Sequence, residues 1–258
     1  MSKNRIAESF NKLKNENRKG FIPFITAGDP DLPVTKELIL MLAETGATVI
    51  ELGVPFTDPM ADGVTIQRSS QSALEQGVSL AWIFEELAAM PKLDTPLLLM
   101  SYLNPLLSFG LDKLAVTAAR TGVCGFIVPD LPVDESEDMR VALDAEGVAL
   151  VQMATPVTEP ARLKRIGDAS QGFVYAVTMT GTTGKNVAVP EDVLNYLDRV
   201  RAASSTPVCA GFGIRSREQV ERLSGHVDGV VVGSALVEVL ERGDDATAFL
   251  RSLRRSTR

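Results

Sequence analysis

Residues 48–54 are Thr-Val-Ile-Glu-Leu-Gly-Val, a short apolar run with a single charge, Glu51, at its centre. Successive side chains of a β-strand point to opposite faces, so Glu51 would lie on the face opposite to Ile50 and Leu52. A run that is apolar on both sides of the charge indicates a strand that is covered on both faces. An unpaired carboxylate is costly to bury there, so Glu51 needs either a cationic partner or a function.

This run is one of eight short β-rich segments that alternate with longer helical patterns. The β-rich segments are 20–25, 48–52, 96–101, 125–128, 149–153, 173–177, 207–210 and 229–232. The helical patterns between them include 34–45, 80–90, 111–121, 135–146, 160–168, 190–203 and 216–223. Such alternation indicates parallel strands joined by crossover helices. Eight strands favour an α/β fold closed into a (β/α)8 barrel, the TIM barrel, over an open doubly wound sheet.

Residues 1–258 are predicted to form a single barrel domain. The length of 258 residues suits a fold that typically needs about 250. No Ser/Gly-rich linker, internal repeat or low-complexity block divides the sequence. Residues 4–17 precede the first strand and predict an extra N-terminal helix that covers the bottom or the side of the barrel.

Composition and charge favour a cytoplasmic protein. The net charge of −7 argues against nucleic acid or an anionic membrane as the main partner. No apolar run is long enough to span a bilayer, and the N-terminus lacks the apolar region of a secretory signal. Cys124 and Cys209 lack C-x-x-C spacing, so we expect reduced core residues and neither a disulfide framework nor a metal site.

Two acidic residues are candidates for acid/base catalysis. The active sites of TIM barrels lie at the C-terminal ends of the strands and in the loops that follow. Glu51 is near the end of the second predicted strand, and Asp62 lies in the turn after it. The alternative for Glu51 is a structural ion pair with an Arg or Lys. His226 is the only histidine and lies far from these segments, so a mechanism with a histidine base is not expected.

Three glycine-rich loops follow the last predicted strands, at 180–184, 210–213 and 232–235. Glycine lets backbone N–H groups approach phosphate oxygens, and TIM barrels commonly hold phosphate with their last loops and a short helix. Ser234 could add a hydroxyl and cap the helix that starts at Ala235. Each loop alone could be a simple turn, but their coincidence favours a phosphate site.

Residues 50–63, IELGVPFTDPMADG, closely resemble a characteristic stretch of the tryptophan synthase α subunit family. The likeness covers nearly the whole chain and includes residues 23–30, 100–105 and 128–132. Thr183-Gly184, Gly211-Phe212-Gly213 and Gly233-Ser234 match the family's phosphate and active-site loops.

The resemblance implies a carbon–carbon lyase that cleaves indole-3-glycerol phosphate to indole and glyceraldehyde 3-phosphate without a cofactor. It also implies a β subunit partner in an α2β2 assembly, in which the β subunit uses pyridoxal phosphate and consumes the indole. Glu51 would protonate indole C3 and then accept the glycerol hydroxyl proton. Asp62 would stabilise positive charge at the indole N–H.

The same resemblance implies roles for residues around the two carboxyls. Thr183 would bond Asp62, and Asp58 and Asp130 would contact the partner. For Met100 and Ile127, plain core packing is an equal alternative. The residues implied to bind substrate are Phe24, Met100, Tyr102, Ile127, Tyr175, Thr183, Gly184, Phe212, Gly213, Gly233 and Ser234.

The sequence departs from the family pattern at Val64, Thr178 and Thr182, which concerns loop closure and not the reaction. Three alternatives stay open: a stand-alone indole-producing lyase, a catalytically impaired allosteric partner of the β subunit, and another barrel enzyme such as an isomerase. Another barrel enzyme of this kind would usually have a lysine at a strand end. No predicted strand end carries one here, since Lys185 lies in a loop, and this counts against that alternative.

Overall fold

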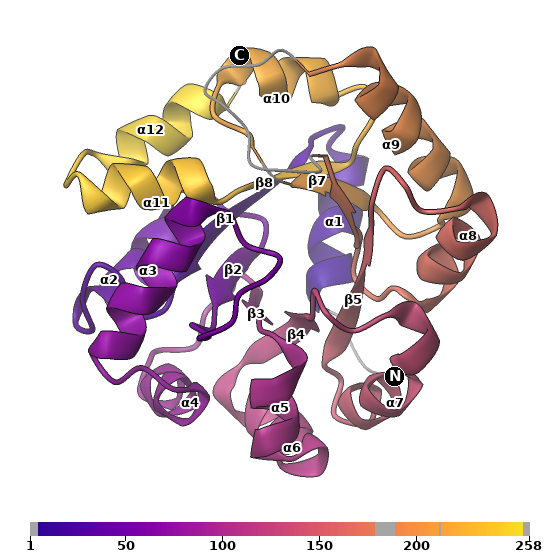
Figure 1. Ribbon diagram of the computed structural model, residues 1–258. Coiled ribbons are helices and arrows are strands. Elements are labelled where there is room, and N and C mark those ends of the chain that lie inside the picture. The colour runs from indigo at the N-terminus through magenta and orange to yellow at the C-terminus, as the bar shows by residue number, and fades with distance from the viewer. Residues whose placement is uncertain (1–4, 179–188, 212, 255–258) are drawn as a thin grey trace.

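The structure, a computed structural model, describes residues 5–178, 189–211 and 213–254. In these residues eight parallel strands form a closed barrel in which each strand pairs with the next and β8 pairs with β1. Helices surround this barrel (Figure 1). The strands are β1 Gly20–Thr26, β2 Ile50–Gly53, β3 Leu97–Met100, β4 Val123–Ile127, β5 Ala149–Ala154, β6 Val174–Val177, β7 Val208–Gly211 and β8 Gly229–Val232. The predicted (β/α)8 barrel and its eight strands are confirmed.

Seven helices correspond to the predicted helical patterns: α2 Val34–Glu44, α4 Leu80–Ala88, α6 Leu111–Thr121, α7 Glu137–Ala145, α8 Pro160–Ala169, α9 Glu191–Ala203 and α10 Arg217–Leu223. The helix expected to run on from Ala235 is α11, Ser234–Glu241. Four further helices were not predicted from the sequence: α3 Val64–Glu75, α5 Leu103–Phe109, α12 Ala246–Leu253 and the short 3-10 helix Val133–Glu135. The buried face of α3 contains Thr65, Ser69 and Ser70, so its hydrophobic period is weak.

The strands alternate between two hydrophobic layers. One layer fills the barrel and includes Ile22 and Phe24 of β1. The other packs against the helices and includes Phe21 and Ile25 of the same strand. Ile50 and Leu52 belong to the outer layer, so Glu51 faces the barrel interior, as the period of two predicts.

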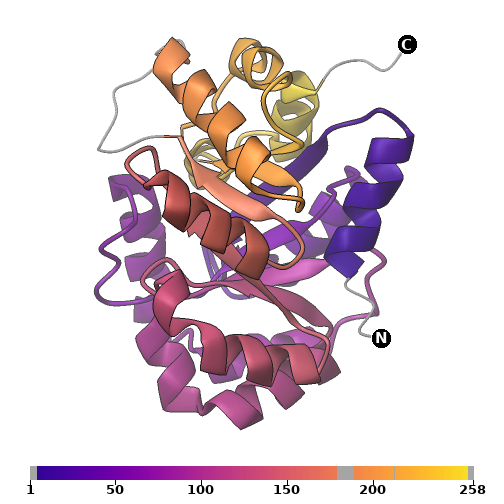
Figure 2. The ribbon, with the colours of Figure 1, turned by 90° about the vertical axis from the view of Figure 1, so that its right-hand side faces the viewer.

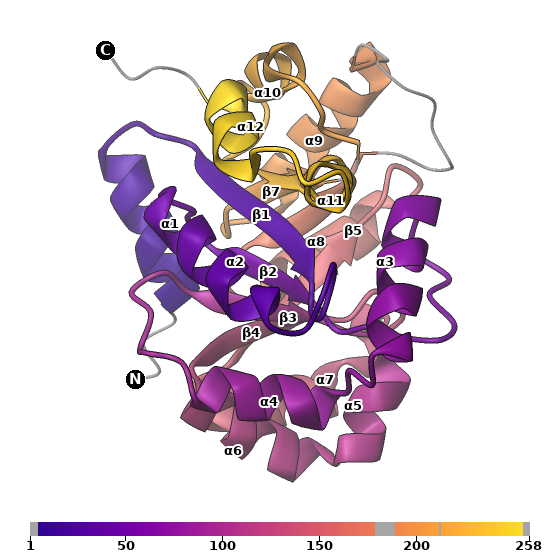
Figure 3. The same ribbon diagram turned by 90° about the vertical axis from the view of Figure 1, so that its left-hand side faces the viewer.

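The N-terminal helix α1, Arg5–Asn15, covers the end of the barrel at which the strands begin (Figure 2). Its Ile6 and Phe10 are buried, and the Phe10 and Phe173 ring centroids are 5.8 Å apart. A Cβ at Gly20 would come within 2.5 Å of the Phe10 ring, so glycine makes room for the helix. In Figure 3, α1 and α3 lie at opposite ends of the barrel. The predicted extra helix is therefore confirmed, and it leaves the other end open for the site.

Both cysteines are buried and free, as expected. Among the helices of the described residues, none is long and apolar enough to cross a membrane.

Candidate active site

Glu51 lies inside the barrel, between two neighbouring strands. In the sheet register it lies opposite Phe24 of β1 on one side and Leu98 of β3 on the other. Its exposed fraction is 1%, and Oε2 has no hydrogen-bond partner among the described residues. No described Lys or Arg contributes to its pKa, so the structural ion pair finds no support in this part of the chain.

Burial raises the pKa of Glu51 to about 8, and the negative charge of Asp62 adds to this effect. Both causes disfavour the carboxylate: hydrocarbon replaces water around it, and a like charge lies nearby. The Glu51 carboxyl is therefore mainly protonated at neutral pH.

Asp62 lies in the loop between β2 and α3 and is held by Tyr102. The Tyr102 hydroxyl donates to Asp62 Oδ2 at 3.0 Å and accepts a hydrogen bond from the Ala61 backbone N–H at 2.9 Å. The rings of Phe56 and Tyr102 stack with centroids 5.1 Å apart, which fixes the tyrosine. Burial raises the pKa of Asp62 to about 6, against the lowering effect of the Tyr102 hydrogen bond.

The two pKa values lie on opposite sides of neutrality. At pH 7 Glu51 is mainly a proton donor and Asp62 mainly a proton acceptor. Environments that separate the pKa values of two carboxyls assign them different acid/base roles.

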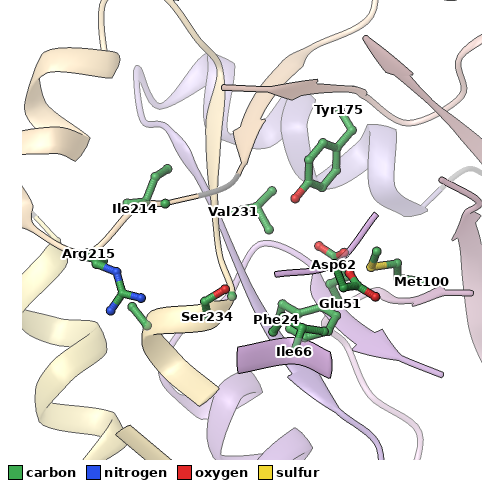
Figure 4. Close-up of a pocket in the computed structure, with 13 residues that line it drawn as sticks. Phe24, Glu51, Asp62, Ile66, Met100, Tyr175, Ile214, Arg215, Val231 and Ser234 are labelled. Carbon is green, nitrogen blue, oxygen red and sulfur yellow. The ribbon is translucent and has the colours of Figure 1, made fainter. Parts of the chain in front are cut away.

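One pocket connects these carboxyls with the ends of β7 and β8 (Figure 4). Glu51, Asp62 and Met100 lie together, while Arg215 and Ser234 lie farther along the pocket. The described residues that line it are Phe24, Glu51, Asp62, Ile66, Met100, Tyr175, Gly213, Ile214, Arg215, Val231, Gly233, Ser234 and Ala235.

Two glycines shape the walls of this pocket. A Cβ at Gly53 would come within 2.6 Å of the Phe24 ring, and one at Gly211 within 2.2 Å of the Tyr175 hydroxyl. Both aromatic side chains can therefore lie over the neighbouring strand only because these positions are glycine. From the sequence, Gly211 was predicted to belong to a phosphate loop, and no role was predicted for Gly53.

The far end of the pocket is formed by the start of α11. The first N–H groups of a helix have no hydrogen-bond partner within the helix and can donate to a bound anion. Ser234 is the first residue of α11 and Gly233 is the N-cap, with no side-chain capping bond. The predicted capping role of Ser234 is therefore wrong, because the helix begins one residue earlier. Gly213 has φ of 80°, a left-handed conformation that favours glycine.

Of the residues predicted to bind substrate, the structure brings Phe24, Met100, Tyr175, Gly213, Gly233 and Ser234 to the pocket together with Glu51 and Asp62. Tyr102 reaches the site through Asp62, and Ile127 is buried in the barrel interior and does not line the pocket. Thr183, Gly184 and Phe212 lie outside the described residues.

The two predicted partner contacts differ in their surroundings. Asp58 is exposed and accepts a hydrogen bond from the neighbouring Thr57 hydroxyl. Asp130 is half-buried and accepts the Leu103 backbone N–H at 2.8 Å, so it also stabilises the start of α5.

Five lining residues were not predicted individually as site residues, although Ala235 ends the glycine-rich loop at 232–235: Ile66, Ile214, Arg215, Val231 and Ala235. Val231 carries a detectable signal, since the period of two places it on the interior face of β8. Ile66 belongs to α3, whose weak hydrophobic period gives no such signal. Arg215 has only its position beside a glycine-rich loop.

Among the described residues, no group of three or more His, Cys, Asp or Glu side chains could hold a metal ion.

A sequence profile described as "Tryptophan synthase alpha chain" matches residues 10–257. The chain belongs to this family. The tryptophan synthase alpha chain of Caulobacter vibrioides (strain NA1000 / CB15N) is 44% identical over 243 residues, which cover 93% of this chain and 88% of that protein. That of Geobacter sulfurreducens is 41% identical over 257 residues, 97% of each chain.

Solved structures agree with this family assignment. Mycobacterium tuberculosis tryptophan synthase superimposes with a TM-score of 0.89 at 34% identity, covering 96% of each chain. Tryptophan synthase subunit alpha from Legionella pneumophila gives a TM-score of 0.86 at 31% identity, also covering 96% of each chain. The chain is thus a lyase of the tryptophan synthase alpha reaction, which needs no cofactor in this subunit; pyridoxal phosphate belongs to the beta subunit.

Proposed function

We propose that this chain cleaves indole-3-glycerol phosphate to indole and glyceraldehyde 3-phosphate. The observation that carries the proposal is the pair of buried carboxyls, with pKa values of about 8 and about 6, in one pocket with the open start of α11. The pair suits proton transfer at an aromatic ring, and the helix start suits a phosphate.

The protonation states match the order of proton transfers that the reaction needs. The C3–glycerol bond breaks readily only after C3 is protonated and the ring loses its aromaticity. Glu51, protonated at neutral pH, gives its proton to C3, while the Asp62 carboxylate takes the proton of the indole N–H. The resulting Glu51 carboxylate then accepts the proton of the glycerol hydroxyl on the carbon bonded to C3.

The electrons of the broken C3–glycerol bond restore the aromatic ring, and the hydroxyl carbon becomes the aldehyde. Asp62 returns its proton to the indole nitrogen. Both carboxyls end in the states in which they began, so the cycle requires no other acid or base. Tyr102 keeps the Asp62 carboxylate oriented through its hydrogen bond.

The pocket walls support the placement of such a substrate. Phe24 and Tyr175 offer aromatic surfaces near the carboxyls for an indole ring. Gly213, Gly233 and Ser234 line the far end, where the phosphate would meet backbone N–H groups. Thr183, Gly184 and Phe212 would complete this binding site. Ile127 would pack in the barrel interior beneath the residues that contact the indole ring.

The proposed partner is a tryptophan synthase β subunit in an α2β2 assembly in the cytoplasm. It would cover the catalytic end of the barrel, so that indole passes between the two sites without entering water. Met60 in the loop after β2 and Val157 in the loop after β5 are 83% and 81% exposed, which suits a contact surface at this end. Asp58 and Asp130 lie in the loops after β2 and β4.

The test is indole formation from indole-3-glycerol phosphate by the purified chain, with and without an added β subunit. We expect a low basal rate that rises strongly with the β subunit. A high rate that the β subunit does not change would favour the stand-alone lyase. No indole under either condition, with tryptophan formation by the β subunit still stimulated, would favour the catalytically impaired partner.

A further inference from the structure

Arg215 lies at the phosphate end of the pocket and has no role in the reaction described above. It belongs to the loop between β7 and α10, two residues after Gly213, and lines the same pocket as Gly233 and Ser234. Figure 4 shows it on the Ser234 side of the pocket, away from Glu51 and Asp62.

The Arg215 guanidinium is held by Glu238 of α11. Its two terminal nitrogens donate to the two Glu238 carboxylate oxygens, each at 2.7 Å. Thr65 at the start of α3 donates to Glu238 Oε1 at 3.1 Å. Arg215 lowers the pKa of Glu238 to about 2, so this carboxylate stays charged at neutral pH. Glu238 lies one turn after Ser234, which keeps the guanidinium beside the first turn of α11.

The guanidinium has donors to spare for an anion. Arginine carries five N–H donors, of which the paired contact with Glu238 uses two. Among the described residues, Glu238 is the one that accepts hydrogen bonds from the Arg215 side chain, whereas Gln219 accepts the backbone N–H of Arg215 at 2.7 Å. The Arg215 side chain is 30% exposed. Among the described residues that line the pocket it is the basic one, and Glu51 and Asp62 are the acidic ones. A planar, permanently charged guanidinium is well suited to phosphate oxygens.

We propose that Arg215 contacts the substrate phosphate, and that Glu238 competes with the phosphate for the same guanidinium and so limits the affinity. This inference rests on the proposed function, because it takes the start of α11 as the phosphate site. It adds a cation to a site otherwise built from backbone N–H groups and a serine hydroxyl.

A purely structural ion pair makes a different prediction. If Arg215 and Glu238 only tie the loop after β7 to α11, loss of either side chain loosens the site and weakens phosphate binding. If they compete as proposed, the two substitutions have opposite effects. Arg215→Met removes the cation and weakens binding, whereas Glu238→Gln keeps the side-chain shape, releases the guanidinium and strengthens binding.

The experiment measures the dissociation constant of sn-glycerol 3-phosphate by titration calorimetry at fixed salt and pH. We expect Arg215→Met to raise it about tenfold or more, the size of a charge-assisted hydrogen bond, and Glu238→Gln to lower it severalfold. Arg215→Lys should lie between wild type and Arg215→Met, because it keeps the charge and loses the paired geometry. The matched control is Arg217→Met, which removes an exposed arginine that pairs with Glu221 on α10 and should leave the constant unchanged.

Unchanged affinity in Arg215→Met, or weaker binding in Glu238→Gln, would overturn the inference. Thermal melts of each variant check the fold, and Glu238→Gln and Arg215→Lys decide the question if Arg215→Met does not fold. Failure of the proposed function is distinguishable, because wild type would then neither bind glycerol phosphate nor form indole.

Discussion

The two ends of the barrel use the same structural device for different purposes. At the N-terminal end, Gly20 and Gly172 make room for Phe10 and Ile6 of α1. At the C-terminal end, Gly53 and Gly211 make room for Phe24 and Tyr175. In each case an absent Cβ lets a large side chain of another segment lie against the backbone.

The polar groups show how the two ends differ. The N-terminal end is filled with buried hydrocarbon, including Ile6, Phe10 and Phe173. The C-terminal end buries Glu51, whose Oε2 has no hydrogen-bond partner in the part of the chain that the structure describes, and raises the pKa of both carboxyls. The first arrangement stabilises the fold, whereas the second lowers stability and creates acid/base groups that titrate near neutral pH.

The largest expected effect is on turnover at the C-terminal end. Glu51→Gln or Asp62→Asn should lower the rate of indole formation about 10²–10⁴-fold, because each removes a positioned acid/base group. Affinity for glycerol phosphate should change far less, since Gly213, Gly233 and Ser234 lie at the other end of the pocket. Near-native turnover in either variant would show that the assigned roles are wrong.

The N-terminal end should give the opposite result. Phe10→Ala should lower the free energy of unfolding by about 3 kcal/mol, since it leaves a cavity next to Phe173. Turnover per folded molecule should stay within about twofold of wild type. Urea unfolding and a rate assay on the same sample check both values, and a large loss of turnover without loss of stability would contradict the separation of the two ends.

Because the fold raises the pKa of Glu51, the free energy of unfolding should fall as the pH rises. The pKa of Glu51 rises from an ordinary 4.5 to about 8 in the fold, so the folded state binds more protons than the unfolded state between these values. The contribution of Glu51 to the free energy of unfolding is fully present below pH 4.5. This contribution is lost as the pH rises towards 8, by about 1.4 kcal/mol per pH unit.

Glu51→Gln removes this titration, so its stability relative to wild type should increase from pH 5 to pH 8. Urea unfolding at several pH values measures the difference. Asp62→Asn is the matched control. Its increase in stability relative to wild type should be complete near pH 6, the raised pKa of Asp62. A constant difference between Glu51→Gln and wild type across this range would mean that Glu51 is not protonated in the fold.

A smaller effect on kcat/KM is expected from substitution of Gly211, one of the two glycines that shape the pocket walls. In Gly211→Ala the new Cβ would meet the Tyr175 hydroxyl at 2.2 Å, so the tyrosine must move. We expect kcat/KM to fall about tenfold, because a displaced wall misplaces the indole ring. Gly225→Ala is the control, as a Cβ there meets nothing within 4 Å. Equal kinetics in the two variants would remove Gly211 and Tyr175 from the site.

The smallest expected effect concerns the partner. Asp58→Ala should reduce stimulation by the β subunit a few-fold, because Asp58 is an exposed charge in the proposed contact. The basal rate should stay nearly intact, because the substitution leaves Glu51 and Asp62 unchanged. Basal and stimulated rates measured in parallel test this. Stimulation equal to wild type would exclude Asp58 from the contact, and a collapsed basal rate would place it in the site itself.

The barrel was predictable from the sequence because its strands are short apolar runs and most of its helices have clear periods. The helix α3 was missed because Thr65, Ser69 and Ser70 occupy its buried face. Alternation along β2 also predicted that Glu51 lies on the face opposite to Ile50 and Leu52, and the structure shows that this face is the barrel interior, since Ile50 and Leu52 are outer-layer residues.

The sequence alone determined the fold and the family and nominated the two carboxyls as candidates, because these depend on local patterns and on a specific motif around Glu51. Only the tertiary structure decided the pKa order of Glu51 and Asp62, the room that Gly53 and Gly211 provide, and the pairing of Arg215 with Glu238. These features depend on burial and on contacts between segments far apart in the chain. Closing the barrel brings those segments together, and no local pattern encodes their distances.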